Sequence, residues 1–233
     1  MRITRIGGPT ALVEWEGWRI LTDPTFDPPG RTYAFAAGAS SRKTTGPAVA
    51  LADIGEIDIV LLSHHHHADN LDARGLRAGD AITLTAEGKP DLVITATPCR
   101  HGAPLTRPIV GPVIGFTLAR VGGAHPVLWM TGDTVMYGAL RRVAAGMRPD
   151  VALVHIGAVK FPLTGPLAYT MDAEDAVELI GLAEPGTAVP VHVEGWSHFS
   201  QQEDAASHVL DAAPGAVRER VRWAPLGEPI DLP

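Results

Sequence analysis

The chain has 233 residues, enough for one large domain or two small ones, and its hydrophobic content of 45% is that of an ordinary globular protein. The formal net charge of −7 argues against nucleic acid or an anionic membrane as a partner. With a single cysteine, no apolar leader and no run that could span a bilayer, we expect one domain over residues 1–233 in the reducing cytoplasm.

The first predicted elements are two strands over residues 11–15 and 18–22, joined by a tight turn at Glu16-Gly17. Asp23-Pro24 ends the second strand. Two interpretations of Asp23 are equally good: it lies near a functional site, or it forms an Asx turn before the proline.

Residues 26–52 form the longest predicted loop and are rich in Pro, Gly, Ser and Thr. Loops of this length are usually functional or disordered, and we interpret this one as a flap over the site. Lys43 lies within it, and the expected place for its side chain is the surface.

The next stretch carries the strongest signal in the chain. It consists of an apolar strand over residues 59–62, then Ser63, the histidine run His64–His67, Asp69 and Asn70. Alternate side chains of an extended segment share a face, so His65 and His67 can point at one metal ion with Asp69 beside them. A register shifted by one residue places His64 and His66 there instead. Imidazole and carboxylate groups suit zinc or a similar cation, whereas a solvated histidine run is the alternative.

Three further predicted strands end close to candidate ligands. The strand over residues 92–96 precedes His101, which by itself could be a solvated loop histidine. The strand over residues 126–130 leads to Gly132 and Asp133. A glycine there allows close approach of the backbone and both carboxylate oxygens can bind an ion, but Asp133 could equally cap a following helix. A last strand, over residues 188–191, ends at His192.

Other elements complete the pattern. Helices are predicted over residues 172–183, capped by Asp172, and from a capping box at Ser200–Glu203 to about residue 212. Further strands are predicted at residues 81–85, 113–118, 151–156 and 221–224, and a short helix or turn at residues 71–78. His155 is interpreted as a core histidine rather than a residue behind the site, and Cys99 as a buried residue at a strand end.

The series of a histidine run, His101, Asp133 and His192, each after a strand, resembles the ligand order of the metallo-β-lactamase superfamily. Within the run the match is His65-x-His67-x-Asp69-Asn70, with asparagine where the family has a histidine. The segment Leu21–Pro24 resembles the opening hairpin of the branch that includes L-ascorbate 6-phosphate lactonase. The resemblance implies an α/β (α+β) fold, the four-layer αββα sandwich.

The resemblance also implies the ligand assignments. One metal ion would be bound by His101 together with His65 and His67 (or His64). A second ion would be bound by Asp69 and His192, and Asp133 would bridge the two ions. We expect one or two zinc ions, with Mn²⁺ or Fe²⁺ possible at the second site because the amide of Asn70 is a weaker donor than imidazole. Such ions would activate water as a hydroxide nucleophile.

The expected function is hydrolysis of a small lactone, ester or amide. His198, just after the last ligand strand, could contact the substrate or protonate a leaving group, or it could simply pack against the core. One alternative is a phosphodiesterase acting on a small phosphorylated or lipid-like substrate, which Arg100 and Arg107 favour slightly. Another is a non-catalytic metal- or ligand-binding protein with a degraded second metal site, which only Asn70 supports.

Overall fold

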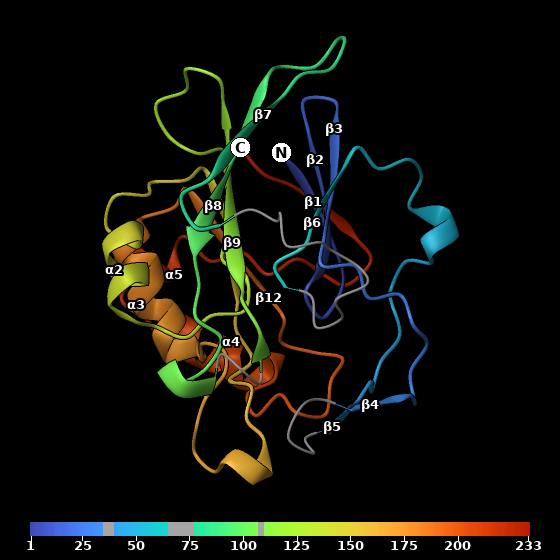
Figure 1. The fold of residues 1–233 in the computed structure, drawn as a ribbon, viewed down its shortest axis with the longest axis vertical. Helices are drawn as coiled ribbons and strands as arrows, with labels where there is room; N and C mark the ends of the chain where they lie inside the picture. The colour runs from blue at the N-terminus through green and yellow to red at the C-terminus, as the bar shows by residue number, and fades with distance from the viewer. Residues whose placement is uncertain (35–39, 65–76, 107–109) are drawn as a thin grey trace.

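The computed structural model describes residues 1–34, 40–64, 77–106 and 110–233. Two β-sheets pack face to face, with helices against the outer face of one of them (Figure 1). The first sheet has the order β13-β1-β2-β3-β6, with β1 at Arg2–Gly7, β2 at Thr10–Trp15, β3 at Trp18–Thr22, β6 at Ile59–Leu61 and β13 at Pro229–Asp231. The second has the order β12-β11-β10-β9-β8-β7, with β7 at Ala81–Leu84, β8 at Leu92–Pro98, β9 at Ile114–Arg120, β10 at Leu128–Met130, β11 at Val151–His155 and β12 at Thr187–Val191.

The main hydrophobic core lies between the two sheets. Ile3, Val13 and Ile20 of the first sheet belong to one buried cluster with Leu118 and Leu128 of the second. Alternate residues of each strand face this layer, which is how two sheets bury a shared core. Packing of this kind fixes the relative position of the strand ends that carry the candidate ligands.

In the described part of the chain, the outer face of the second sheet is covered by α2 at Gly138–Ala144, α3 at Ala173–Ala183, α4 at Glu203–Asp211 and α5 at Gly215–Arg218. Helix α3 buries Ala176, Leu179 and Ile180, in the same cluster as Ala152 and Val154 of β11. None of the helices in the described ranges combines the length and the apolar character that crossing a membrane requires.

The outer face of the first sheet is covered differently. Ile54 packs there on Leu12 and Leu21, just after the short 3-10 helix η2 at Leu51–Asp53. Two other 3-10 helices, η3 at Pro104–Thr106 and η4 at Pro162–Thr164, lie in loops. In the described residues this outer layer is therefore a loop with one helical turn, thinner than the helical layer on the other side.

The helix over residues 172–183 is confirmed, and its cap is the predicted one. Asp172 accepts a hydrogen bond from the backbone N–H of Asp175 at 2.9 Å. The capping box at the next helix is wrong, because the Ser200 hydroxyl donates to the carbonyl of Ala158 instead. Helix α4 consequently begins two residues later than predicted, with Gln202 as its N-cap in place of Ser200.

The strand predicted over residues 221–224 is also wrong. Val221 forms only an isolated bridge with Ala188, whereas the last strand is β13, which pairs antiparallel with β1. The apolar character of residues 221–224 comes instead from burial: Val221 packs against the helices and Ala224 against the main core.

The loop over residues 26–52 contains more regular structure than expected. Strands β4 at Thr32–Ala34 and β5 at Ser40–Arg42 pair in a small hairpin. Its end is fixed to the segment after the last candidate ligand, because the Thr44 N–H donates to the carbonyl of Gly195 at 2.8 Å.

The first turn of α3 contains an unfavourable charge. Burial, together with Asp172 and Glu178, raises the pKa of Asp175 to about 6. A raised carboxyl pKa means that stability falls as the pH rises from about 4 through about 6 and stays lower above that. The shift of two pKa units corresponds to about 2.7 kcal/mol, which we reduce to about 1 kcal/mol because the group is half-exposed.

We therefore expect Asp175→Asn to raise the free energy of unfolding by up to about 1 kcal/mol at pH 8, and by less at pH 4. Urea unfolding at both pH values measures this difference. Glu174→Gln is the matched control, because it removes one negative charge from an exposed position in the same turn. Equal stabilisation by both variants would mean that net charge, and not burial of Asp175, is responsible.

Candidate metal centre

Four candidate ligands lie close together where strands of both sheets end. Asp133 follows β10, His192 follows β12, His101 follows β8 and His64 follows β6. His192 Nε2 is 3.5 Å from Asp133 Oδ2, and the rings of His64 and His101 have centroids 5.7 Å apart. Strand ends in an α/β sheet are a common location for a site, since the loops that follow them converge there.

Asp133 is the charged centre of this group. Burial by itself would raise its pKa, but four nearby histidines outweigh that effect and hold the pKa of Asp133 below its usual range. These histidines are His192, His64, His101 and His155. Asp133 does not cap the following helix, because the N-cap of α2 is Tyr137.

Gly132 has the positive φ of 66° and the close backbone contact that its position before Asp133 suggested. A Cβ there would lie 2.7 Å from the carbonyl oxygen of Ile114, so a side chain cannot be accommodated without a shift of the backbone. The glycine therefore brings the strand end close to its neighbour and positions the carboxylate that follows.

His101 is held in the tautomer that a metal ligand needs. Its Nδ1 lies 2.8 Å from the carbonyl oxygen of Tyr169, which can only accept, so Nδ1 carries the hydrogen. The lone pair is then on Nε2. Burial lowers the pKa of His101, so the imidazole is neutral, as binding of a metal requires.

His192 is held by its backbone in a strained conformation. Its φ of 63° is unusual for a residue with a side chain. The backbone N–H donates to the carbonyl of Gly8 at 2.9 Å, which connects this strand end to the turn between β1 and β2. Burial lowers the pKa of His192 to about 3, so its ring is also neutral.

The histidine run is described only at its first residue. His64 lies beside His101, and its Nδ1 is 2.8 Å from the hydroxyl of Ser63. The predictions for His65, His67 and Asp69, like the substitution at Asn70, lie outside the described residues.

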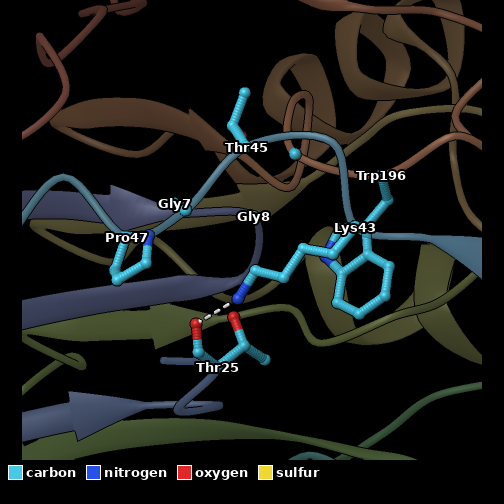
Figure 2. Close-up of a pocket in the computed structure, with 9 residues that line it drawn as sticks. Gly7, Gly8, Thr25, Lys43, Thr45, Pro47 and Trp196 are labelled. Atoms are coloured by element: carbon cyan, nitrogen blue, oxygen red, sulfur yellow. Dashed lines mark hydrogen bonds between the residues drawn. The ribbon is translucent and has the colours of Figure 1, made fainter. Parts of the chain in front are cut away.

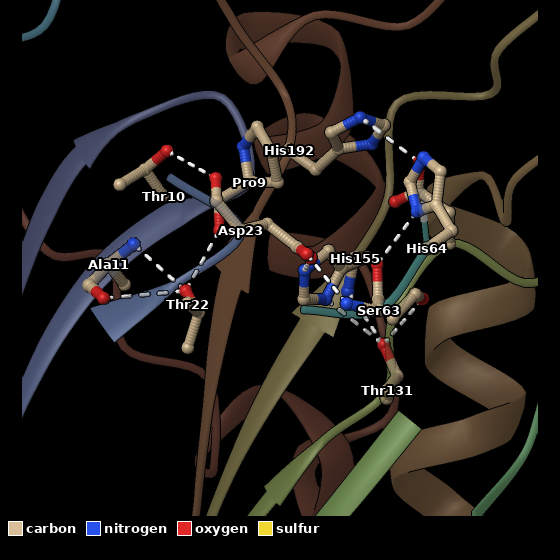
Figure 3. A network of polar contacts seen from close by, with 12 residues as sticks. Pro9, Thr10, Ala11, Thr22, Asp23, Ser63, His64, Thr131, His155 and His192 are labelled. Carbon is tan, nitrogen blue, oxygen red and sulfur yellow. Dashed lines mark hydrogen bonds and ion pairs between the residues drawn. The ribbon is translucent and has the colours of Figure 1, made fainter. Parts of the chain in front are cut away.

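Two residues lie behind this group: Asp23, for which a position near the site was one of two interpretations, and His155, which was interpreted as a core histidine. Asp23 accepts a hydrogen bond from the backbone N–H of Ser63 at 2.7 Å, and its other oxygen is 3.9 Å from His155 Nε2 (Figure 3). Burial, with a contribution from Asp133, raises the pKa of Asp23 to about 7. Asp23 is thus bonded to the segment that precedes the histidine run, which excludes the interpretation as a local Asx turn.

His155 is fully buried, as a core histidine would be, but it is not a satisfied one. Its Nε2 has no hydrogen-bond partner among the described residues, and its ring centroid is 6.0 Å from that of His192. His155 ends β11, which lies between two strands that also end at candidate ligands. That position could have indicated from sequence that His155 lies next to the candidate ligands.

His198 lies among aromatic rings next to the same group. Its ring stacks on Phe161 with a centroid distance of 5.3 Å and an interplanar angle of 13°. Phe199 meets both His198, at 4.9 Å, and His192, at 4.4 Å. Burial lowers the pKa of His198 to about 4. The ring is therefore neutral and close to the candidate ligands.

Lys43 is buried, with only 4% of the residue exposed, so the expected surface position is wrong. Its ammonium group donates to the carbonyl of Thr25 at 2.6 Å and lies over the ring of Trp196, inside a small pocket (Figure 2). Cys99 donates its thiol hydrogen to the carbonyl of Thr131, and burial raises the pKa of that thiol, so it is unsuited to act as a nucleophile.

Comparisons with known proteins identify relatives of this chain. The profile of the family described as "Beta-lactamase superfamily domain" matches residues 67–193. A "UPF0173 metal-dependent hydrolase" of Opitutus terrae is 31% identical over 211 residues, which cover 82% of this chain and 84% of the relative. The chain belongs to the metallo-β-lactamase superfamily. A second relative with the same description, from Carboxydothermus hydrogenoformans, is 27% identical and covers 84% of this chain and 86% of its own.

Solved structures of other proteins share the fold of this chain. An isothiocyanate hydrolase from Delia radicum gut bacteria matches with a TM-score of 0.76 at 17% identity, covering 100% of this chain and 99% of its own. A possible metal-dependent hydrolase from Veillonella parvula matches with a TM-score of 0.78 at 16% identity, again covering 100% and 99%. The expected metallo-β-lactamase fold is confirmed, and the protein is a metal-dependent hydrolase.

The described residues of this hydrolase fit part of a metal site. Asp133 Oδ1 and His192 Nδ1 are buried and have no hydrogen-bond partner among the described residues. Buried polar atoms without partners are costly, and a cation would give the carboxylate oxygen one. In the same described ranges no three His, Cys, Asp or Glu side chains are arranged to hold an ion by themselves. An ion held here would need further donors, and the histidine run continues beyond His64.

Proposed function

We propose that this metal-dependent hydrolase cleaves a small lactone, ester or amide with one or two zinc ions. The proposed ligands are His64, His101, Asp133 and His192, with His65, His67 and Asp69, which follow His64 in the chain. The observation that carries the proposal is the arrangement of Asp133 with the histidines around it. An ionised carboxylate among neutral imidazoles is the protonation state in which such groups bind a divalent cation.

The residues around the site prepare it before any substrate binds. The carbonyl of Tyr169 fixes the tautomer of His101, and the carbonyl of Gly8 fixes the backbone of His192. When bound, the metal lowers the pKa of water and polarises the attacked carbonyl group. Ligands that are already oriented need no rearrangement during the reaction, which is the source of most electrostatic catalysis.

For His198 we propose contact with the substrate through a neutral N–H group. The lowered pKa of His198 leaves little of the protonated imidazolium near neutral pH, so this ring is poorly suited to act as a general acid. A neutral imidazole can nevertheless donate a hydrogen bond to the oxygen on which negative charge develops. The aromatic rings around it, Phe161 and Phe199, keep water away from that bond.

The lactonase-like branch is favoured by Asp23, which lies in the segment that resembles the opening hairpin of that branch and accepts a bond from Ser63. The phosphodiesterase alternative is less well supported, because the guanidinium of Arg100 lies over the ring of Tyr137 at 4.6 Å. Arg107, its other support, lies outside the described residues. The non-catalytic alternative still depends on Asn70, and a weaker second site there would favour Mn²⁺ or Fe²⁺.

A metal-and-substrate panel tests this proposal. The protein is stripped with a chelator, reloaded separately with Zn²⁺, Mn²⁺ or Fe²⁺, and assayed with a γ-lactone, p-nitrophenyl acetate, an anilide and bis-p-nitrophenyl phosphate. We expect metal-dependent turnover, with kcat/KM for a lactone or ester at least about tenfold above that for the phosphodiester. Turnover of the phosphodiester alone would favour that alternative. Stoichiometric metal binding without turnover of any substrate would favour the non-catalytic one.

A further inference from the structure

The hairpin β4–β5 is connected to the segment that contains His198. The Ser197 N–H donates to the carbonyl of Arg42 at 3.0 Å, and the Arg42 N–H donates to the hydroxyl of Ser197 at 2.9 Å. Lys43 and Trp196 form an isolated antiparallel bridge one step further along. Residues that are more than 150 positions apart in the sequence therefore form a short piece of sheet beside the candidate metal centre.

Ser41, in the middle of β5, contacts His198 through its hydroxyl group. Ser41 is 2% exposed, and its Oγ is hydrogen-bonded to His198 Nδ1. The stacking on Phe161 determines the plane of the imidazole ring, but it does not distinguish one nitrogen from the other. The bond from Ser41 does, because it holds Nδ1 on the side of the hairpin.

The same bond determines which ring nitrogen carries the hydrogen. A buried hydroxyl needs an acceptor, and for Ser41 the two within reach in the described residues are His198 Nδ1 and the Ser197 hydroxyl. Ser197 Oγ is 3.4 Å away, which is long for an O–H···O bond. The Ser41 hydrogen therefore points at Nδ1, and the hydrogen of the neutral ring is on Nε2.

We infer that Ser41 is a positioning residue for the hydrolase. Its hydroxyl holds His198 in the Nε2–H tautomer, which gives the ring an N–H donor for an oxygen of the substrate. The role of the donor rests on the proposed function, whereas the tautomer does not. The long loop over residues 26–52 thus completes the active site with one hydroxyl group.

The test compares Ser41→Ala with Ser41→Thr in the zinc-loaded full-length protein. We expect Ser41→Ala to lower kcat about 10- to 100-fold for the best substrate of the panel, as loss of an orienting partner does. KM and zinc content should stay within about twofold, since no proposed ligand changes. Ser41→Thr keeps the hydroxyl and should recover most of the activity.

Ser197→Ala is the matched control. It removes the hydroxyl that accepts from Arg42 but leaves the partner of His198, so kcat should change by less than about threefold. If Ser41→Ala and Ser197→Ala lower kcat equally, the hydroxyl of Ser41 only attaches the hairpin, and the inference is wrong.

A second measurement does not depend on activity. Nitrogen-15 NMR of the histidine rings distinguishes the two neutral tautomers, and the His198→Gln variant identifies the signal of His198. We expect the Nε2–H tautomer in the wild type and a mixture in Ser41→Ala. An Nδ1–H tautomer in the wild type would overturn the inference and leave the proposed hydrolase function intact. Failure of every substrate with the expected tautomer present would instead count against the proposed function.

Discussion

Replacing His192 by alanine is expected to lower metal content and to reduce kcat/KM by more than about 100-fold. Mutation of residues that only hydrogen-bond to metal ligands already lowers metal affinity or activity about 10- to 100-fold. The variant removes a buried imidazole that is 3.5 Å from the carboxylate of Asp133. The metal would lose a donor, and Asp133 would lose the neighbour with the largest favourable effect on its ionised form. Elemental analysis after dialysis, together with assays on the best substrate, measures both effects.

His101→Ala should also lower metal content and kcat/KM. The hydrogen bond from His101 Nδ1 to the carbonyl of Tyr169 leaves the lone pair on Nε2, and the variant removes that donor. His208→Ala is the control, since it removes an exposed histidine of α4 whose Nδ1 is hydrogen-bonded to a carbonyl of its own helix. We expect wild-type metal content and activity for it. Full metal content and full turnover in both site variants would mean that neither histidine is a ligand.

Sequence was most informative where a strand ends at a chemically distinctive residue. Asp133 and His192 follow buried strands of one sheet, and parallel pairing of β10, β11 and β12 brings their carboxyl ends to the same edge. Their proximity therefore follows from the strand pattern and the superfamily topology. The arrangement of the sheets could be predicted from the resemblance to the superfamily and not from the strand pattern alone, because β10, β11 and β12 are buried on both faces and show no alternation.

Residues that act through distant partners could not be predicted in this way. Nothing in the sequence around Ser41 or Lys43 distinguishes them from residues of a solvated loop. Ser41 is buried because its hairpin pairs with Arg42 and Ser197 across the molecule, and Lys43 because Trp196 covers it. Contacts of this kind depend on the tertiary arrangement, which local composition does not encode.

The wrong capping box illustrates the same limit. The spacing from Ser200 to Glu203 suits a cap, but the Glu203 carboxylate is paired with Arg5, a residue at the other end of the chain. A buried cation competes more strongly for a carboxylate than a backbone N–H at a helix end does. The sequence from Ser200 to Glu203 therefore has the spacing of a capping box, but the long-range ion pair with Arg5 prevents Glu203 from acting as part of one.

That ion pair leads to the second large effect, because Arg5→Met is expected to lower the free energy of unfolding by about 3–5 kcal/mol. Arg5 is 1% exposed and its guanidinium lies 2.8 Å from Glu194 and 2.7 Å from Glu203. It also donates to the carbonyl of Ala224 at 2.9 Å. Methionine fills much of the space but leaves the carboxylate of Glu194 without its cation, and the cost is a large part of the 5–15 kcal/mol typical of a domain.

The effect of Arg5→Met should extend to the metal centre. Glu194 uses its other oxygen to accept from the Gly8 N–H at 2.9 Å, and the carbonyl of Gly8 accepts from the backbone N–H of His192. If Glu194 moves towards solvent when Arg5 is removed, the backbone that holds His192 in its strained conformation loses a support. We therefore expect weaker zinc binding by Arg5→Met at a temperature where the variant is still folded.

Arg2→Met provides the matched comparison, because Arg2 lies on the same strand and pairs with Asp231 in solvent, with side chains 51% and 75% exposed. An exposed pair contributes little, so this variant should be indistinguishable from wild type in urea unfolding and in zinc titration. Equal destabilisation by the two variants would mean that the loss of any arginine from β1 weakens the sheet. A destabilised Arg5→Met with unchanged zinc affinity would mean that the network supports the fold without positioning His192.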